Sequence, residues 1–308
     1  MEHRVSVNKV GICYHPKLAD EVGRRLAEEL RAIAARHVAE TWIASAWDED
    51  ATREHMPGTG LLVCVGGDGT VLRAARVGCE HETLLLGVNM GHLGFLTELD
   101  PEGALERLPD VIAGHGRIEE RAMLHAEVVL PGAGDGERAA AHDALNDIVI
   151  GRVSLGRTVE VSVRIDGALL ADYKADGVIV ATATGSTAYS LSAGGPILAP
   201  EARELLLTPL APHLAFRNSV VLPATAMVEV KLGSGQRAAF SIDGERELDL
   251  GPGDSVHMKL GPHRARFVRL GPPTEFYERL ARQLNWLRAA QAGDIDALRS
   301  VLGEEAPA

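Results

Sequence analysis

The feature that most constrains this chain is an apolar run that passes directly into a glycine-rich loop and then into a helical pattern. Residues 61–65 predict a buried strand, Gly66-Gly67-Asp68-Gly69-Thr70 predicts a tight turn, and residues 71–77 predict a helix. This order places the turn at the carboxyl end of a strand, where α/β sheets bind their ligands. Gly67 and Gly69 would let a phosphate approach the backbone, and the helix start would offer free N–H groups.

Asp68 is the informative residue of this loop, because a carboxylate among phosphate-binding groups would repel an anionic ligand. Accepting a proton from an attacking hydroxyl is one role for it. Capping the following helix is the alternative. The loop has neither the Gly-x-x-x-x-Gly-Lys-Ser/Thr pattern of a P-loop nor the Gly-x-Gly-x-x-Gly pattern of a dinucleotide-binding turn.

The two halves of the chain differ in their apolar patterns. In the first, predicted strands at 5–14, 61–65 and 83–88 alternate with predicted helices at 16–36, 71–77 and 101–112. This alternation predicts an α/β domain with a parallel sheet over residues 1–115. Most of 116–272 reads as short strands, with hairpin-turn chemistry at Asp166-Gly167 and Asp243-Gly244, which predicts an all-β domain. The strands are predicted at 126–130, 144–150, 159–165, 178–181, 219–222, 226–232, 238–242, 255–260 and 264–270.

The end of the chain returns to a helical pattern. Residues 274–290 place apolar side chains on one face, with Thr274 as the expected N-cap. A single helix after a β-domain must pack somewhere, and we expect it to pack back onto the first domain. The polar residues 291–308 are expected to be loosely held.

Charge and cysteine usage exclude several classes of protein. A formal net charge of −12 argues against a general nucleic-acid binder, which needs a basic face. No run reaches 18 apolar residues and the first residues have no apolar signal segment, so we expect a cytoplasmic protein without a membrane partner. Three cysteines at wide spacing and twelve histidines without ligand spacing predict no disulfide framework and no metal site.

Two further segments carry polar groups suited to a ligand. Asn146-Asp147 opens a predicted strand and offers donors and acceptors for ribose hydroxyls or an adenine edge, although such a pair alone is more typical of a strand start. The second segment, 173–196, contains a predicted strand at 178–181, the hydroxyl-rich turn Thr184-Gly185-Ser186-Thr187 and a short helical stretch at 188–192.

In this order, the loop 66–70, the pair Asn146-Asp147 and the run 176–196 resemble the motifs of the NAD kinase family, the ATP/polyphosphate-dependent NAD kinases. Residues 89–97 are similar to its Asn-x-Gly-x-Leu-Gly-Phe-Leu segment, and 211–213, 241–244 and 276–286 agree with further stretches. The resemblance covers about residues 5 to 288. The motifs are specific in combination, whereas the Gly-Gly-Asp-Gly-Thr loop alone also occurs in lipid kinases and 6-phosphofructokinases.

The resemblance implies a Rossmann-like or phosphofructokinase-like N-terminal domain, a sandwich-like β-domain and a homodimer or homotetramer. The implied reaction moves the γ-phosphoryl group of ATP, or polyphosphate, to the 2′-hydroxyl of the adenosine ribose of NAD. Mg²⁺ or another divalent cation would arrive with ATP. Asp68 would be the general base, and Arg73 and Lys174 are candidates to neutralise phosphate. The implied NAD-binding residues are Gly67, Asp68, Gly69, Asn89, Phe95, Asn146, Asp147, Asp176, Thr184, Thr187, Ala188, Tyr189 and Ser190.

Departures from the family pattern are Ala183 in place of a common proline, Glu245 in place of a common glutamine, and the stretch 214–218. Two other functions fit parts of the chain. A diacylglycerol- or sphingosine-type lipid kinase shares the first loop but not the 184–190 run, and a non-catalytic NAD-binding protein would not need Asp68. The sequence leaves open ATP against polyphosphate, NAD against NADH, dimer against tetramer, and regulation by NADPH.

Overall fold

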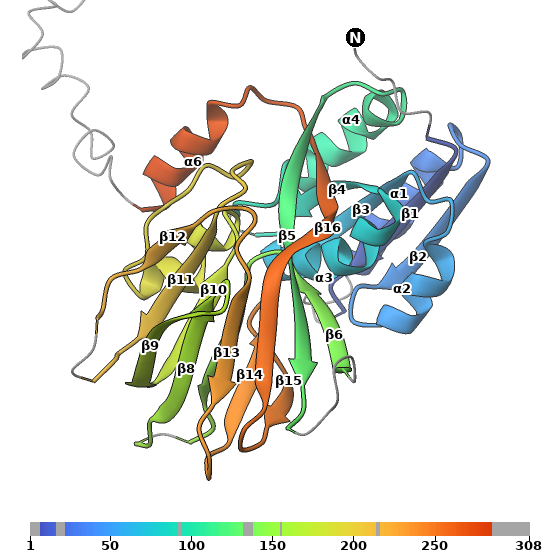
Figure 1. The fold of residues 1–308 in the computed structure, drawn as a ribbon. Helices are drawn as coiled ribbons and strands as arrows, with labels where there is room; N and C mark the ends of the chain where they lie inside the picture. Colours follow the sequence, from blue (N-terminus) through green and yellow to red (C-terminus); the bar gives the residue numbers. More distant parts are fainter. Residues whose placement is uncertain are drawn as a thin grey trace, which may run out of the picture.

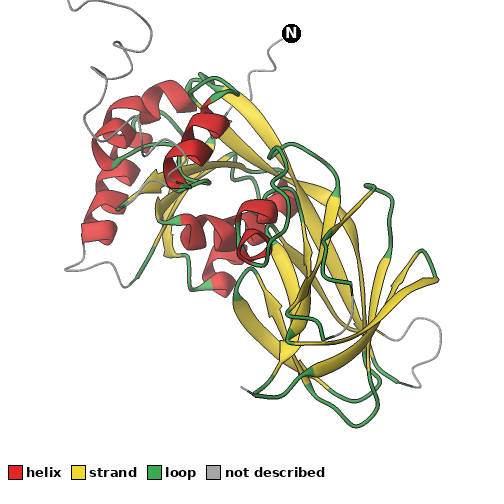
Figure 2. Cartoon of the chain, turned by 90° about the vertical axis from the view of Figure 1, so that its left-hand side faces the viewer, coloured by secondary structure: helices red, strands yellow, loops and turns green. Residues whose placement is uncertain are grey.

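The computed structural model describes residues 7–16, 22–91, 94–131, 138–154, 156–213 and 216–284. The predicted helical residues 285–290 and the predicted tail 291–308 lie outside this part of the chain. Among the described residues most helices gather at one end of the molecule and the β-rich region occupies the other, as Figures 1 and 2 show.

The helices are α1 (Val22–Ala34), α2 (Glu49–His55), α3 (Asp68–Gly78), α4 (Pro101–Ile112), α5 (Tyr189–Ser192) and α6 (Glu275–Gln283). The strands of the first half are β1 (Lys9–Tyr14), β2 (Glu40–Ser45), β3 (Leu61–Gly66), β4 (Leu84–Asn89), β5 (Arg117–Val129), β6 (Arg138–Ala144) and β7 (Asp147–Arg152). The remaining strands are β8 (Val159–Ile165), β9 (Ala168–Ala175), β10 (Gly177–Ala181), β11 (Leu205–Leu210), β12 (Val220–Leu222), β13 (Val228–Leu232), β14 (Ala238–Ile242), β15 (Glu245–Leu250) and β16 (Ser255–Arg269).

The α/β part is built on four parallel strands in the order β2-β1-β3-β4. Every residue of β3 and β4 is buried, as expected for strands covered by helices on both faces. One face packs against α1 and α4, and the other packs against α3. The helix α4 begins as its sequence predicts, because Asp100 accepts the Gly103 N–H at 2.7 Å and Pro101 occupies the first turn.

The β-rich part is a sandwich of two sheets. The first sheet continues from β4 through β16, β13, β8 and β9, with β5 and β6 branching from β16. The second has the order β12-β11-β10-β7-β14-β15 and is antiparallel throughout. Apolar side chains of both sheets fill one shared core, with Tyr173 and Phe240 among its largest members.

The fold class predicted from the sequence is confirmed, but the two halves are more closely joined than two separate domains would be. The predicted strands 255–260 and 264–270 form one strand, β16, with an irregularity between Leu260 and Arg264. This strand pairs in parallel with β4 and antiparallel with β5 and β13, so one continuous sheet runs through both parts (Figure 1). Both predicted hairpin turns are confirmed, with positive φ at Asp166, Gly167, Asp243 and Gly244.

Candidate active site

The glycine-rich loop lies between β3 and α3, at the carboxyl end of the parallel sheet. Gly66 is required by packing, because a Cβ atom there would lie 2.1 Å from Thr70 Oγ1. Gly67 and Gly69 are exposed, and a Cβ atom on either would meet no atom within 4 Å. The space in front of the loop is therefore open to a ligand at the positive end of an eleven-residue helix.

The Asp68 side chain does not cap α3, so the alternative interpretation of this residue as a helix cap is wrong. Gly67 occupies the N-cap position and makes no side-chain cap. The Asp68 carboxylate instead crosses to the loop after β4. There it accepts the Phe95 N–H on Oδ2 at 2.9 Å and the Leu96 N–H on Oδ1 at 3.0 Å.

The loop that holds Asp68 is shaped by Asn89 and Gly94. Asn89 is buried and closes the loop on itself, since its Nδ2 donates to the Gly91 carbonyl at 2.9 Å and its Oδ1 accepts the Gly91 N–H at 3.0 Å. A Cβ atom at Gly94 would lie 2.0 Å from Asp68 Oδ1. Asn89 thus supports the loop, and Gly94 leaves the space that the Asp68 carboxylate occupies.

The second and third sequence motifs form one structural unit. Thr182 bonds to the 145–146 segment twice, through its N–H to the Asn146 carbonyl at 2.9 Å and through its Oγ1 to the Leu145 carbonyl at 2.5 Å. Gly185 rests on the same peptide, and a Cβ atom there would lie 2.1 Å from the Asn146 carbonyl oxygen. Leu145 packs in the same core cluster as Val71, Leu72 and Leu96, so this unit adjoins the Asp68 loop.

Sequence reasoning assigned no role to Asp243, which organises this unit. Its carboxylate accepts the N–H groups of Asn146 at 2.7 Å, Leu145 at 3.1 Å and Asp147 at 3.3 Å. The Asp243 N–H in turn donates to the Asp147 carbonyl at 2.9 Å. The Asp-Gly hairpin and the family resemblance of residues 241–244 were the sequence signals here, and neither reveals a contact with residues almost a hundred positions earlier.

Asp147 and Asp243 are two neighbouring carboxyl groups whose pKa values are both raised. Burial, followed by the charge of Asp243, raises the pKa of Asp147 from 3.8 to about 7. Burial also raises the pKa of Asp243 to about 6, although the Asn146 and Leu145 N–H groups and the charge of Arg76 oppose this. Near neutral pH the raised pKa leaves Asp147 partly protonated, so its carboxyl can donate as well as accept hydrogen bonds.

A pocket of about 310 Å³ opens beside this pair. Its lining consists of Asn146, Asp147, Val149, Ala188, Tyr189, Ser241, Asp243 and Gly244. At the edge of this pocket, the Tyr189 side chain is about half exposed. The structure therefore brings together four of the predicted NAD-binding residues, namely Asn146, Asp147, Ala188 and Tyr189.

The hydroxyl residues of the third motif support the turn. Ser190 is fully buried, with its Oγ 3.0 Å from Thr208 Oγ1. Thr187 donates its Oγ1–H to the Thr184 carbonyl at 3.1 Å, and Thr184 itself is buried. Ala183 is also buried and does not line the pocket. These residues fix the backbone that presents Ala188 and Tyr189.

The structure does not bring Asp176 and Lys174 to this pocket. Asp176 precedes β10 and the Thr182 turn follows it, so the five residues of the strand, roughly 16 Å, separate the two ends. Asp176 pairs with Arg152 at 3.0 Å, and Lys174 pairs with Glu160 at 3.4 Å on the exposed strand β9. Asp176 and the Thr182 turn are close in the sequence, but the strand between them places its two ends at opposite edges of the sheet. The sequence alone therefore does not show that they are separated.

Arg73 and Arg76 of α3 are both paired with Glu245. The Arg73 guanidinium contacts Glu245 and lies 4.5 Å from the centre of the Trp47 ring, and Arg76 reaches Glu245 at 3.1 Å. Glu245, a departure from the family pattern, thus ties α3 to the β14–β15 hairpin. Its charge also offsets the charge that Arg73 would offer to phosphate.

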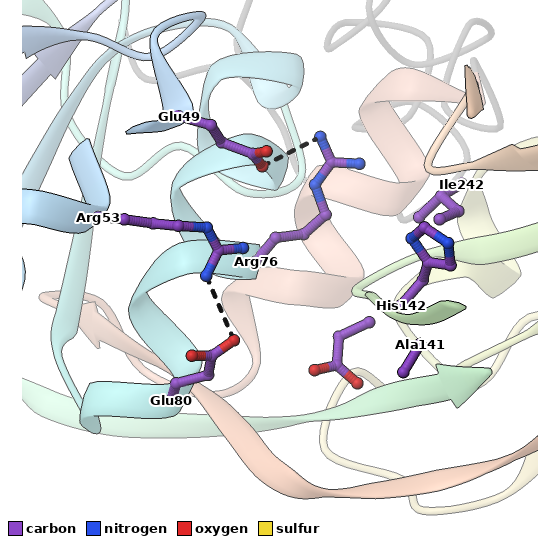
Figure 3. Close-up of a pocket in the computed structure, with 8 residues that line it drawn as sticks. Glu49, Arg53, Arg76, Glu80, Ala141, His142 and Ile242 are labelled. Atoms are coloured by element: carbon purple, nitrogen blue, oxygen red, sulfur yellow. Dashed lines mark hydrogen bonds and ion pairs between the residues drawn. The ribbon is translucent and has the colours of Figure 1, made fainter. Parts of the chain in front are cut away.

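A second, smaller pocket of about 130 Å³ lies beside Arg76 (Figure 3). Its charged walls are already paired, with Arg76 at 3.7 Å from Glu49 and Arg53 at 3.4 Å from Glu80. His142 and Ile242 form the opposite wall in the same view. Asp143 also lines this pocket, so its walls carry three carboxylates and two guanidinium groups.

Comparisons with known proteins match both parts of the chain to domains of one kinase family. The ATP-NAD kinase N-terminal domain model matches residues 1–116, and the ATP-NAD kinase C-terminal domain model matches residues 145–270. An NAD kinase of Dehalococcoides mccartyi is 40% identical over 278 residues, which cover 90% of this chain and 95% of that protein. An NAD kinase of Chloroflexus aggregans is 43% identical over 224 residues, or 73% of this chain and 80% of the relative.

Among solved structures, yeast NADH kinase complexed with NADH superposes with a TM-score of 0.79 at 25% identity, covering 94% of this chain and 90% of that one. The fold and the open loop in front of Asp68 are those of a nucleotide-dependent phosphotransferase. Within that class, the chain belongs to the ATP-NAD kinase family.

Proposed function

We propose that this protein transfers the γ-phosphoryl group of ATP to the 2′-hydroxyl of the adenosine ribose of NAD, with Asp68 as the general base. One observation carries the assignment of the base. The Asp68 carboxylate is fixed by the Phe95 and Leu96 N–H groups at the edge of an exposed glycine loop, where a hydroxyl can reach its remaining lone pairs. Phosphoryl transfer depends mainly on positioning and charge stabilisation, and this loop offers both.

The pocket beside Asn146 and Asp147 is the proposed site of the NAD adenosine. Asn146 and the partly protonated Asp147 can donate to and accept from ribose hydroxyls and base edges. Tyr189 offers an exposed aromatic ring at the rim. Gly67 and Gly69 expose backbone N–H groups that can face phosphate oxygens.

The residues present fit a divalent cation that is carried mainly by the nucleotide. Within the part of the chain that the structure describes, no group of three or more His, Cys, Asp or Glu side chains could hold a metal. Mg²⁺ commonly keeps several waters and binds through phosphates with one or two carboxylates, and Asp68 is the carboxylate of the loop. Bound in this way, the ion would neutralise charge on the transferred phosphoryl group.

A cytoplasmic location, a homodimer or homotetramer, and polyphosphate as an alternative donor stay predictions. Across the described residues, no helix combines the length and apolar character needed to cross a membrane. The lipid-kinase alternative has no support in the comparisons, whose members are NAD kinases and an NADH kinase.

The test is an acceptor and donor screen with purified protein. NAD, NADH and diacylglycerol are offered with ATP-Mg²⁺ or polyphosphate, and NADP formation is followed with a coupled dehydrogenase. We expect NADP formation from NAD, lowered about 10²–10⁴-fold by Asp68→Asn with NAD affinity largely retained, because a general base contributes a factor of this size. Asp110→Asn, an exposed change on α4, is the matched control. Phosphorylation of lipid without NADP formation would overturn the assignment, and near-normal turnover of Asp68→Asn would remove the general-base role.

A further inference from the structure

The two peptide groups that hold Asp68 are themselves held from behind by buried arginines. Arg269, at the end of β16, donates Nη1 to the Leu96 carbonyl at 3.1 Å and Nη2 to the Phe95 carbonyl at 3.4 Å. The peptide between Phe95 and Leu96 therefore carries an arginine on its oxygen and Asp68 on its nitrogen. Hydrogen bonds in such a chain polarise one another, so the guanidinium strengthens the N–H that Asp68 accepts.

Arg279 of α6 holds the next carbonyl of the same loop. Its Nη1 donates to the Thr97 carbonyl, which also lies 3.5 Å from Arg269 Nη1. The Thr97 Oγ1 accepts the Gly94 N–H at 3.2 Å, and Gly94 is the residue where the Asp68 carboxylate leaves no room for a Cβ atom. The helix α6 also places Phe276 with its ring centre 6.3 Å from that of Phe95. A helix almost two hundred residues away in sequence thus fixes the loop behind Asp68.

The arginines are kept in place by three carboxylates. Glu98 pairs with Arg269 at 3.1 Å and Arg279 at 3.2 Å, and its Oε1 accepts the Leu270 N–H at 2.6 Å. Glu119 pairs with Arg269 at 3.1 Å, and Glu275 pairs with Arg279 at 2.8 Å. The side chains of Glu98, Arg269 and Arg279 are less than a tenth exposed. Charges at this depth are costly unless they are paired and hydrogen-bonded, so the network has one favoured arrangement.

We propose that Arg269 and Arg279 are positioning residues for Asp68, acting through the carbonyls of residues 95–97, so that α6 contributes to the active site through Arg279. This inference rests on the proposed role of Asp68 as the base. A purely architectural network would dock α6 without affecting the chemical step. If Arg279 acts by positioning Asp68, its substitution lowers turnover only while Asp68 is present. If Arg279 is purely architectural, its substitution has the same effect with or without Asp68.

The experiment is a double-mutant cycle on turnover in the full-length protein. The variants are Arg279→Met, Asp68→Asn and the combination, with Arg282→Met as the matched control, since Arg282 lies on the same helix and bonds to its own Glu278 carbonyl. We expect Arg279→Met to lower kcat about 10–100-fold per folded molecule, with the NAD Kd changed less than about threefold, because small misplacements of a catalytic group have effects of this size. In the Asp68→Asn background the same change should have almost no further effect.

Several outcomes would overturn the inference. Equal loss of kcat from Arg279→Met in both backgrounds would show an architectural role, and a normal kcat would show no role in turnover. If Arg279→Met does not fold, Arg279→Lys decides, because an ammonium has its three donors on one nitrogen and cannot span the Thr97 carbonyl, Glu98 and Glu275 as the guanidinium does. A reduced kcat at constant Kd supports the inference, and an unchanged kcat overturns it. Absence of NADP formation by the unaltered protein would instead overturn the proposed function.

Discussion

The two sides of the candidate site use the same residue type in opposite surroundings. On the α/β side, Asp68 receives two backbone N–H groups, and behind them stand the guanidinium groups of Arg269 and Arg279. On the β-side, burial and the charge of Asp243 raise the pKa of Asp147 to about 7, and burial raises the pKa of Asp243 to about 6. The comparison shows that surroundings, more than residue type, decide the role of a carboxyl group. Asp68 is held by two backbone donors, whereas Asp147 is buried beside another carboxylate and is partly protonated near neutral pH.

Among changes that leave Asp68, Asp147 and Asp243 themselves unaltered, the largest expected effect comes from removing the space that Asp68 occupies. Gly94→Ala would place a Cβ atom 2.0 Å from Asp68 Oδ1, so the carboxylate must leave its two N–H donors. We expect kcat to fall about 10²-fold with the NAD Kd nearly unchanged. Gly251→Ala, whose Cβ atom would meet only an ordinary 3.5 Å contact, is the control in the same kinetic and thermal assays. A raised Kd with normal kcat would mean that the loop serves binding and not chemistry.

A similar change on the β-side should affect binding instead. Gly185→Ala would place a Cβ atom 2.1 Å from the Asn146 carbonyl oxygen and push the 184–190 turn away from the pocket. We expect the KM for NAD to rise about tenfold and the free energy of unfolding to fall by about 1–3 kcal/mol, the usual cost of overpacking. Turnover at saturating NAD should change much less. Steady-state kinetics and denaturant titration measure these quantities, and an unchanged KM would separate this turn from the NAD pocket.

The smallest expected effect concerns pH and the Asp147–Asp243 pair. A pKa raised from 3.8 to about 7 means that the folded state binds a proton more tightly than the unfolded state, so stability falls as pH rises from about 4 to about 7. Asp147→Asn cannot ionise, and we expect it to be more stable than the unaltered protein at pH 8 by about 1–3 kcal/mol, discounted from the full linkage value for the coupling with Asp243. At pH 5 this advantage should shrink.

Thermal unfolding at several pH values provides the measurement, with the exposed Asp172→Asn on β9 as the control. A constant difference in Tm between Asp147→Asn and the unaltered protein across this pH range would contradict the raised pKa of Asp147.

Local patterns predicted the fold class and the glycine loop, because an apolar strand, a turn and a helix are adjacent in sequence. Long-range contacts were not predictable in this way. Asp243 binds the Asn146 N–H 97 positions away, and Arg279 binds Thr97 182 positions away. The strand β11 was missed because Leu205–Leu210 has no alternation and contains Pro209, a residue that argues against a strand. β16 was divided in two because Gly261-Pro262 interrupts its apolar pattern at the irregularity after Leu260.

The strand β16 also sets an order of events when the chain is made. Leu84 of β4 pairs with Arg266, so the edge of the parallel sheet stays uncovered until residues near 266 have been synthesised. At ~5–20 residues per second, the ribosome needs roughly 10–40 s to cover that interval. During this time the unpaired edge of β4, whose leucines and valine are buried in the folded protein, is available to other chains. Nascent chains that stop before β16 should therefore be the aggregation-prone species and the preferred clients of chaperones.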